Sequence, residues 1–394
     1  MARETDLKNT DFQSEKAGSI IKSKRKFGVE LEVLATSRNS YETLINQIST
    51  AYGIHHDGSI EGSGMGIEIV TPIMSGVKGE NEIKKLLANM VSLGFTTNKS
   101  CGFHVHHDGT QFLSPKTTEI RCKPMYDLYD RTPEEYRNTI ADKKFFSLQN
   151  RLYSMLLGKG FSMEDIYNAF LKSYTTKGGK ERVDVSIKNH IYKVNRLSTH
   201  FYLNNITVAT DDIWFETAKD DVTSLKNILY AYTVFDDVFQ MLVPSDRREA
   251  NRFCKKLSTR IAPYEIQQCK TMEDLETLWY RAKTKTAINT KKNTKYDESR
   301  YYLANFHSLF AKYNTIEIRL HEGTLNEKVV LYWIAIHQHI IDRLSNGYNA
   351  IGVMEQACDM FDRDEKLKFF LRFFKFSKEL ENYIIHRAEF FKTN

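Results

Sequence analysis

Residues Ser100–Asp108 read Ser-Cys-Gly-Phe-His-Val-His-His-Asp, and His104 and His106 stand two positions apart within them. On a β-strand this spacing places both imidazoles on one face, roughly 7 Å apart at about 3.3 Å per residue. Phe103 and Val105 then face the opposite side, toward an apolar core. Paired imidazoles are natural contacts for metal ions or phosphates, but an ordinary half-exposed strand can also carry histidines. The stretch alone leaves both interpretations open.

A second segment, Phe27–Leu34 (Phe-Gly-Val-Glu-Leu-Glu-Val-Leu), alternates in the same way. Its aliphatic residues share one strand face, and Glu30 and Glu32 share the other. Two neighbouring carboxylates on one face repel each other, so a purely structural role explains them poorly. A shared cation would remove the repulsion, and a plain exposed strand is the alternative.

Two further segments combine one apolar face with one polar face. Glu68 lies between two isoleucines, after a glycine-rich loop that matches no nucleotide-binding fingerprint. In Thr315–Thr324, the polar Glu317, Arg319 and His321 alternate with apolar residues. A merely wet sheet face would favour Thr, Ser, Lys and Gln. These strands instead collect carboxylates, imidazoles and a guanidinium.

The predicted polar face gathers a set of candidate metal and phosphate contacts, namely Glu30, Glu32, Glu68, His104, His106, Glu317 and Arg319. Hard carboxylates with one or two imidazoles suit Mg²⁺ or Mn²⁺ better than a closed zinc site. Several acids on one face indicate more than one metal ion. Such ions beside arginines favour phosphoryl transfer, because metals bridge phosphate oxygens and arginines neutralise charge. The chain has no Walker A, protein-kinase or dinucleotide motif, so a nucleotide would bind through metals and arginines on the sheet.

Composition sets the broad class of the protein. The chain has 394 residues, 41% of them hydrophobic and 27% charged, as in globular proteins, and its net charge is +6. This mild charge permits an anionic ligand such as a nucleotide without requiring nucleic acid. Five cysteines without a Cys-x-x-Cys pair fit reduced thiols. The polar first residues indicate no secretory signal, and no apolar run approaches the ~20 residues that span a bilayer. We expect a soluble cytoplasmic protein without membrane contact, of open oligomeric state.

The chain is predicted to contain four parts: a flexible leader at 1–26, a catalytic domain at 27–108 and 222–345, an insertion or cap at 109–221, and a helical extension at 346–394. The insertion is expected to be mostly helical. The stretch Arg281–Lys295 is basic, contains no acid and is rich in Thr and Asn. We expect it to be mobile, either as a disordered surface loop or as a lid that meets an anionic substrate.

Six short motifs occur in an order that resembles a known family. They are Phe27–Val33 (FGVELEV), Asp57–Ser59 (DGS), Gly66–Pro72 (GIEIVTP), Ser100–His106 (SCGFHVH), Ser245–Arg248 (SDRR) and Arg300–Thr324. The set resembles the amidoligases of the glutamine synthetase-like carboxylate–amine ligase superfamily, over about residues 27–108 and 230–345. The resemblance implies an α+β fold. A curved antiparallel sheet would carry helices on its outer face and hold magnesium and ATP on its concave face.

The resemblance also implies roles for individual residues. The metal ligands would be Glu30, Glu32, Glu68, His104 and Glu317. His106 would contact nucleotide or metal, and Arg319 would hold the transferred phosphate. Three more arginines are candidates for nucleotide phosphate or substrate binding, namely Arg247, Arg248 and Arg300. Asp57 and Asn305 match motif positions without an assigned role. The implied cofactors are ATP and Mg²⁺ (or Mn²⁺), and the long 109–221 insertion departs from the family pattern.

The expected activity is ATP-dependent carboxylate–amine ligation. ATP would phosphorylate a substrate carboxylate, and an amine would displace the phosphate to form an amide or isopeptide bond. Each substrate could be a small molecule, a peptide, a protein side chain or a modified nucleobase. Glu30→Ala or Glu317→Ala should abolish activity with little loss of folding, because removing one carboxylate relieves like-charge repulsion. Two alternatives stay open: a metal-dependent hydrolase, and an altered scaffold that binds nucleic acid or protein.

Overall fold

The computed structural model describes residues 18–113, 116–122, 213–219, 222–248, 251–345 and 349–393. The chain forms two compact units: Met1–Leu113, Ser224–Ser345 and Ala350–Asn394 make the first, and Ser114–Thr223 with Asn346–Asn349 make the second. In the second unit, β5 (Lys116–Cys122) and β6 (Ile213–Lys219) pair antiparallel. The helices expected in the insertion at 109–221 lie outside the described residues. The four predicted domain boundaries therefore stay predictions.

The first unit contains a six-stranded sheet in the order β2-β3-β1-β4-β8-β7, with every described pairing antiparallel. The strands are β1 (Phe27–Ala35), β2 (Gly53–His56), β3 (Met65–Val70), β4 (Gly102–Asp108), β7 (Ala304–Asn305) and β8 (Thr315–Glu322). The predicted α+β class with an antiparallel sheet is confirmed. The glutamine synthetase-like form of that sheet stays a prediction.

Strand alternation gives this sheet its two faces. In β1 every second residue from Phe27 to Val33 is buried, while Glu30 and Glu32 are only partly buried. Val29 pairs with Val105 of β4, so the apolar residues of neighbouring strands share a face. The apolar face forms the core, and the opposite face carries the acids and the two site histidines.

The helices of the first unit are α1 (Arg38–Gln47), α2 (Gly76–Ser92), α3 (Thr110–Leu113), α10 (Val222–Val234), α11 (Asp236–Met241), α12 (Pro263–Gln268), α13 (Met272–Tyr280), α14 (Lys285–Lys292), α15 (His307–Ala311), α16 (Glu327–Leu344), α17 (Ile351–Met354), α18 (Arg363–Phe374) and α19 (Lys378–Thr393). Short 3₁₀ turns lie at Ser245–Arg247, Leu257–Thr259, Glu298–Arg300 and Glu355–Ala357. No helix in these ranges is long and apolar enough to cross a bilayer.

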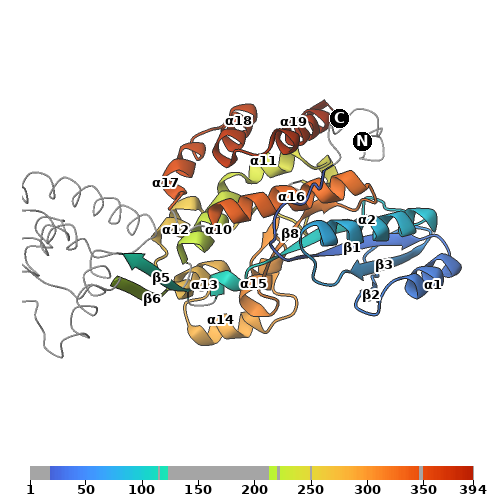
Figure 1. Ribbon diagram of the computed structural model, residues 1–394, viewed down its shortest axis with the longest axis horizontal. Helices are drawn as coiled ribbons and strands as arrows, with labels where there is room; N and C mark the ends of the chain where they lie inside the picture. Colours follow the sequence, from blue (N-terminus) through green and yellow to red (C-terminus); the bar gives the residue numbers. More distant parts are fainter. Residues whose placement is uncertain are drawn as a thin grey trace, which may run out of the picture. The chain divides into compact units, whose positions relative to one another are not determined.

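Helices α2 and α16 lie side by side and cover the apolar face of the sheet (Figure 1). Gly79 of α2 sits directly against the Phe27 ring of β1, and a Cβ at that position would collide with the ring. On α16, the Trp333 ring meets the ring of His321 from β8 at a centroid distance of 4.7 Å. This cover leaves the acidic face of the sheet free to form a site.

A second layer of helices packs behind α16 (Figure 1). The ring of Phe235, between α10 and α11, lies 5.2 Å from Phe370 and 5.9 Å from Phe374 of α18. The phenylalanines of α18 thus pack onto the core.

The basic stretch Arg281–Lys295 differs from its predicted form. Most of it is α14, whose N-cap Thr284 accepts a hydrogen bond from the Ala287 amide. Lys292 pairs with Glu276 of α13 at 2.5 Å. The prediction of a mobile loop is wrong over the helix, because capping and this ion pair satisfy the polar groups locally.

Candidate functional site

Register brings the predicted polar residues together from four strands. Glu30 of β1 pairs with His104 of β4, and His106 pairs with Glu317 of β8. On the other side of β1, Glu32 pairs with Glu68 of β3. Directly opposed residues of antiparallel strands project from the same face. The sheet therefore carries these groups as one continuous cluster.

Glu30 lies between the two site histidines. Its Oε2 is 3.2 Å from His104 Nδ1, and its Oε1 is 3.1 Å from His106 Nε2. Burial disfavours the ionised carboxyl, but the hydrogen bonds from both imidazoles outweigh it and hold the pKa of Glu30 well below its ordinary value. Glu30 is thus a carboxylate at neutral pH.

Glu317 is the most enclosed acid of the cluster, with 2% of its surface exposed. Its carboxylate accepts from Arg319 Nη1, and its Oε2 accepts from Asn305 Nδ2 at 2.6 Å. Burial opposes ionisation, yet Arg319 and His106 keep the pKa of the carboxyl below its ordinary value. Asn305, whose role the sequence left unassigned, comes from β7 and orients this acid.

His106 has a second partner that the sequence did not indicate. Its Nδ1 lies 2.9 Å from Thr315 Oγ1, and Ser308 Oγ lies 3.0 Å from the same hydroxyl. Burial lowers the pKa of His106, but Glu317 and Glu30 more than offset this and raise it. The hydroxyl chain fixes the imidazole while its Nε2 faces Glu30.

A second group of acids adjoins the first and consists of Glu32, Asp57 and Glu68. One oxygen from each lies within 4.8 Å of the others. Burial, reinforced by Glu30, Glu32 and Asp57, raises the pKa of Glu68 to about 7. Glu32 Oε2 also accepts from the Gly102 amide at 2.5 Å. Asp57, a turn residue after β2, thereby joins the predicted ligands.

The donor atoms of both groups fit divalent cations. Glu30, His104 and Glu317 also offer one ligand atom each within 4.8 Å of one another. Carboxylate oxygens with one imidazole nitrogen are ligands that Mg²⁺ and Mn²⁺ accept. The mutual repulsion that raises the pKa of Glu68 is what a bound cation would relieve.

A β-bulge shapes the β8 side of the site. Between the pairs Phe103–His321 and Val105–Ile318, β8 has one residue more than β4. His321 is consequently on the apolar face, where its ring lies 5.6 Å from Phe103. The simple alternation predicted for β8, with His321 on the polar face, is wrong for that residue.

Arg247 supports this bulge. Its side chain donates to the Arg319 carbonyl at 2.9 Å and to the Leu320 carbonyl at 3.3 Å, and it is 5% exposed. Arg248 points elsewhere and donates to the carbonyls of Val243 and Phe391, each at 2.9 Å. The structure therefore brings Arg247 to the site and does not bring Arg248 there.

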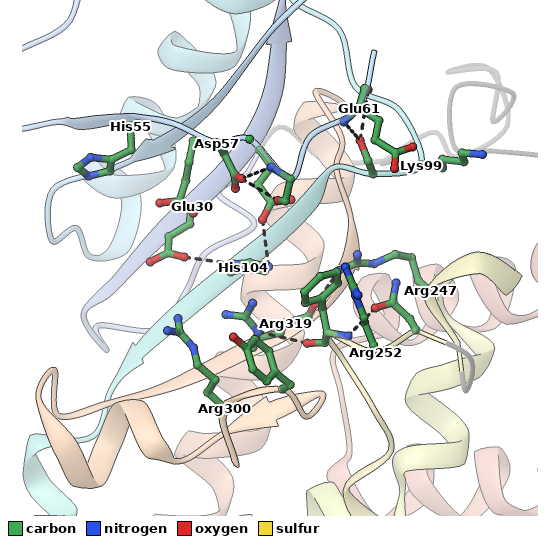
Figure 2. Close-up of a pocket in the computed structure, with 18 of the residues that line it drawn as sticks. Glu30, His55, Asp57, Glu61, Lys99, His104, Arg247, Arg252, Arg300 and Arg319 are labelled. Carbon is green, nitrogen blue, oxygen red and sulfur yellow. Dashed lines mark hydrogen bonds and ion pairs between the residues drawn. The ribbon is translucent and has the colours of Figure 1, made fainter. Parts of the chain in front are cut away.

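The acidic face opens into a cavity of about 860 Å³. Figure 2 shows its acids on one side, including Glu30 and Asp57, and on the other side its arginines, Arg247, Arg252, Arg300 and Arg319. His104 lies between the two sets. The predicted Arg300 is in this wall, whereas Arg252 was not singled out from the sequence. No pattern marked it, because it lies in an irregular segment far from the strands in sequence.

Comparison with protein families gives one match. The model of a family described as "Putative amidoligase enzyme" covers residues 56–121 and 212–341. These ranges include Asp57, Glu68, His104 and Glu317, while Glu30 and Glu32 precede them. Searches of curated proteins and of solved structures return no match. The chain belongs to this amidoligase family and is, by that membership, a ligase-type enzyme.

Proposed function

We propose that the protein is an ATP-dependent carboxylate–amine ligase that forms an amide through an acyl phosphate. One observation carries the proposal: the two adjacent acid groups and Arg319 lie together on or beside the polar face of the sheet, and all of them except the buried Glu317 line one cavity. Acids that hold metal ions beside a buried arginine are what phosphoryl transfer requires. Family membership supports the ligase class.

Two groups of residues would hold divalent metal ions: Glu30, His104 and Glu317 in one, and Glu32, Asp57 and Glu68 in the other. Bound magnesium would supply charge neutralisation for the triphosphate. Asn305 and Arg319 hold Glu317, and Thr315 holds His106, so these side chains are oriented before any ligand binds. Such preorganisation lowers the reorganisation needed at the moment of reaction.

The first chemical step activates the acid. A carboxylate oxygen of the substrate attacks the γ-phosphorus of ATP, and ADP leaves. Arg319 is cationic, since its pKa is raised by the surrounding Glu317 and Glu30 although burial opposes this. Its guanidinium lines the cavity and would neutralise charge on the transferred phosphoryl group.

The second step forms the amide. The lone pair of an uncharged amine attacks the carbonyl carbon of the acyl phosphate, the carbon–oxygen bond to phosphate breaks, and the proton lost by the amine nitrogen ends on the released phosphate. Activation is needed because a carboxylate is a poor electrophile and hydroxide a poor leaving group. The cavity would contribute by holding acid, amine and nucleotide close together.

The test is ADP release from Mg²⁺-ATP with pooled acids and amines, with mass spectrometry of products that have lost water. We expect release that EDTA abolishes and that Glu30→Gln lowers by at least about a hundredfold. Glu61→Gln is the matched control, because Glu61 lines the cavity outside both acid groups.

Full ADP release by Glu30→Gln, or release in EDTA, would refute the proposed site. Metal-dependent hydrolysis without nucleotide would instead support a hydrolase built on the same acids. Salt-sensitive nucleic-acid binding without ATP turnover would support a binding scaffold.

A further inference from the structure

The cavity has a wall of alternating cations and aromatic rings. It is formed by Arg252 and Phe253 and by Lys295, Tyr296, Arg300 and Tyr301, and is called the basic aromatic wall below. The Phe253 and Tyr301 rings meet edge to face with centroids 5.9 Å apart. The Arg252 guanidinium lies 4.6 Å from the Phe253 centroid. Arg300 lies 5.7 Å from the centroid of Tyr296 and 5.8 Å from that of Tyr301.

The cations of this wall have no carboxylate partner among the described residues. Arg300 Nη1 donates to the Lys295 carbonyl at 2.7 Å, which fixes the guanidinium, while its buried Nε has no partner in the described ranges. Arg252 lies over the Phe253 ring and Lys295 over the Tyr296 ring, and neither cation forms an ion pair within the part of the chain that the structure describes. By contrast, Arg260 and Arg281, outside the cavity, each pair with a glutamate.

The wall is joined to the reaction centre through Arg319. Arg319 Nε donates to the Phe253 carbonyl at 3.4 Å, while its Nη1 binds Glu317. In the view of Figure 2, Arg252 and Arg300 lie on either side of Arg319. A ligand whose reacting group lies at Arg319 therefore has the basic aromatic wall beside it.

We propose that the basic aromatic wall binds the acid substrate, and that this acid carries a second anionic group besides the carboxylate that becomes phosphorylated. The inference rests on the proposed function. Magnesium ions held by the two acid groups, together with Arg319, would already offset the charge of the triphosphate and of the reacting carboxylate. Arg252, Lys295 and Arg300 supply positive charge beyond that need. The planar guanidinium groups of Arg252 and Arg300 suit a second carboxylate or a phosphate.

The aromatic rings indicate the chemical character of the chain that links the two anionic groups of the substrate. Tyr296 is 65% exposed and Phe253 is 39% exposed, although both border a polar cavity. Exposed rings beside unpaired cations offer an apolar surface for the chain that links two anionic groups. The acid is thus a dianion with an apolar spacer.

The test measures binding of acids to the full chain by calorimetry, with and without Mg²⁺ and a non-hydrolysable ATP analogue. A series of dicarboxylic acids of increasing length is compared with the monocarboxylic acids of the same lengths. We expect at least one dianion to bind about tenfold more tightly than its monoanion, because a partly enclosed arginine–carboxylate contact is charge-assisted.

Variants then locate the second anion. Arg300→Gln and Arg252→Gln should each reduce dianion binding about fivefold to tenfold and leave monoanion and nucleotide binding unchanged. Lys285→Gln is the control: it removes the same charge from an exposed position on α14 outside the cavity.

Three results overturn the inference: no acid in the series binds better as a dianion, both variants keep the full preference, or Arg300→Gln weakens the ATP analogue as much as the dianion. The last result would assign the wall to the nucleotide. Failure of the ATP analogue to bind at all would count against the proposed function instead, and the titrations without nucleotide would still decide the dianion preference.

Discussion

Replacement of Glu68 by glutamine should stabilise the metal-free protein. Glu68 shares its group with Glu32 and Asp57, and Glu30 adds a further like charge. No described residue forms an ion pair with Glu68, and the three neighbouring carboxylates repel its ionised form. Glutamine keeps the shape of the side chain and removes the repulsion.

The magnitude follows from the pKa. Burial and the neighbouring carboxylates raise the pKa of Glu68 from its ordinary 4.5 to about 7. Such a rise corresponds to roughly 3 kcal/mol in full. Glu68 is only partly buried, so solvent screening reduces the expected gain to about 1–2 kcal/mol. A raised carboxyl pKa penalises the folded state above about pH 7, and the penalty disappears toward pH 4.5. The gain should therefore be full near pH 8 and shrink on acidification.

The assay is urea unfolding of wild type and Glu68→Gln in EDTA at several pH values. Glu61→Gln, an exposed acid of the same cavity, should change the free energy of unfolding by less than about 0.5 kcal/mol. Added Mn²⁺ should stabilise wild type more than the variant, because a metal that binds only the folded state adds its binding free energy. A Glu68→Gln protein that is less stable than wild type in EDTA would refute the reasoning.

Four further substitutions test other parts of the structure. Glu317→Ala should lower the free energy of unfolding by about 3 kcal/mol in urea titrations, because it leaves the buried cation of Arg319 without its ion-pair partner. For this acid, the expectation from the sequence that the variant folds with little loss is therefore revised. Gly102→Ala should weaken Mn²⁺ binding about tenfold in calorimetry, since its Cβ would lie 3.0–3.2 Å from site side chains. Gly323→Ala should instead destabilise the fold by over about 2 kcal/mol, because its Cβ would collide with the Cβ of Cys101. His337 is fully buried, and burial lowers its pKa to about 3. Between about pH 7 and 5.5 the unfolded chain therefore binds a proton at this residue while the folded protein does not. Over this range the free energy of unfolding, measured in urea, should fall by about 1 kcal/mol more for wild type than for His337→Gln.

The face of the candidate site could be predicted because strand alternation has a period of two. Glu30, Glu32, Glu68 and His104 needed only that period and antiparallel pairing to meet. His107 follows His106 directly, so the same period turns it to the other face, and it is buried there under the helices. A local rule was sufficient for these residues, since each lies in a regular strand.

Residues supplied by turns and loops were harder to predict. Asp57 reaches the acid group from the turn after β2, and Asn305 reaches Glu317 from a two-residue strand. Arg252 and Tyr296 border the cavity from irregular segments. Their positions depend on tertiary packing, because no periodicity connects them to the strands in sequence.

The adjacent residues Arg247 and Arg248 show that an arginine expected to act through its charge can instead act as a hydrogen-bond donor to backbone carbonyls. The resemblance of their motif implied that both are candidates for binding phosphate or substrate. The extra residue of β8, however, leaves the carbonyls of Arg319 and Leu320 without regular partners on β4, and these carbonyls are buried. Arg247 satisfies them with donors that a lysine could not place in the same plane. A bulge beside a site thus leaves backbone carbonyls that need a fixed hydrogen-bond donor. The Arg247 guanidinium donates to these carbonyls, and it thereby also holds the backbone from which the Arg319 side chain enters the cavity.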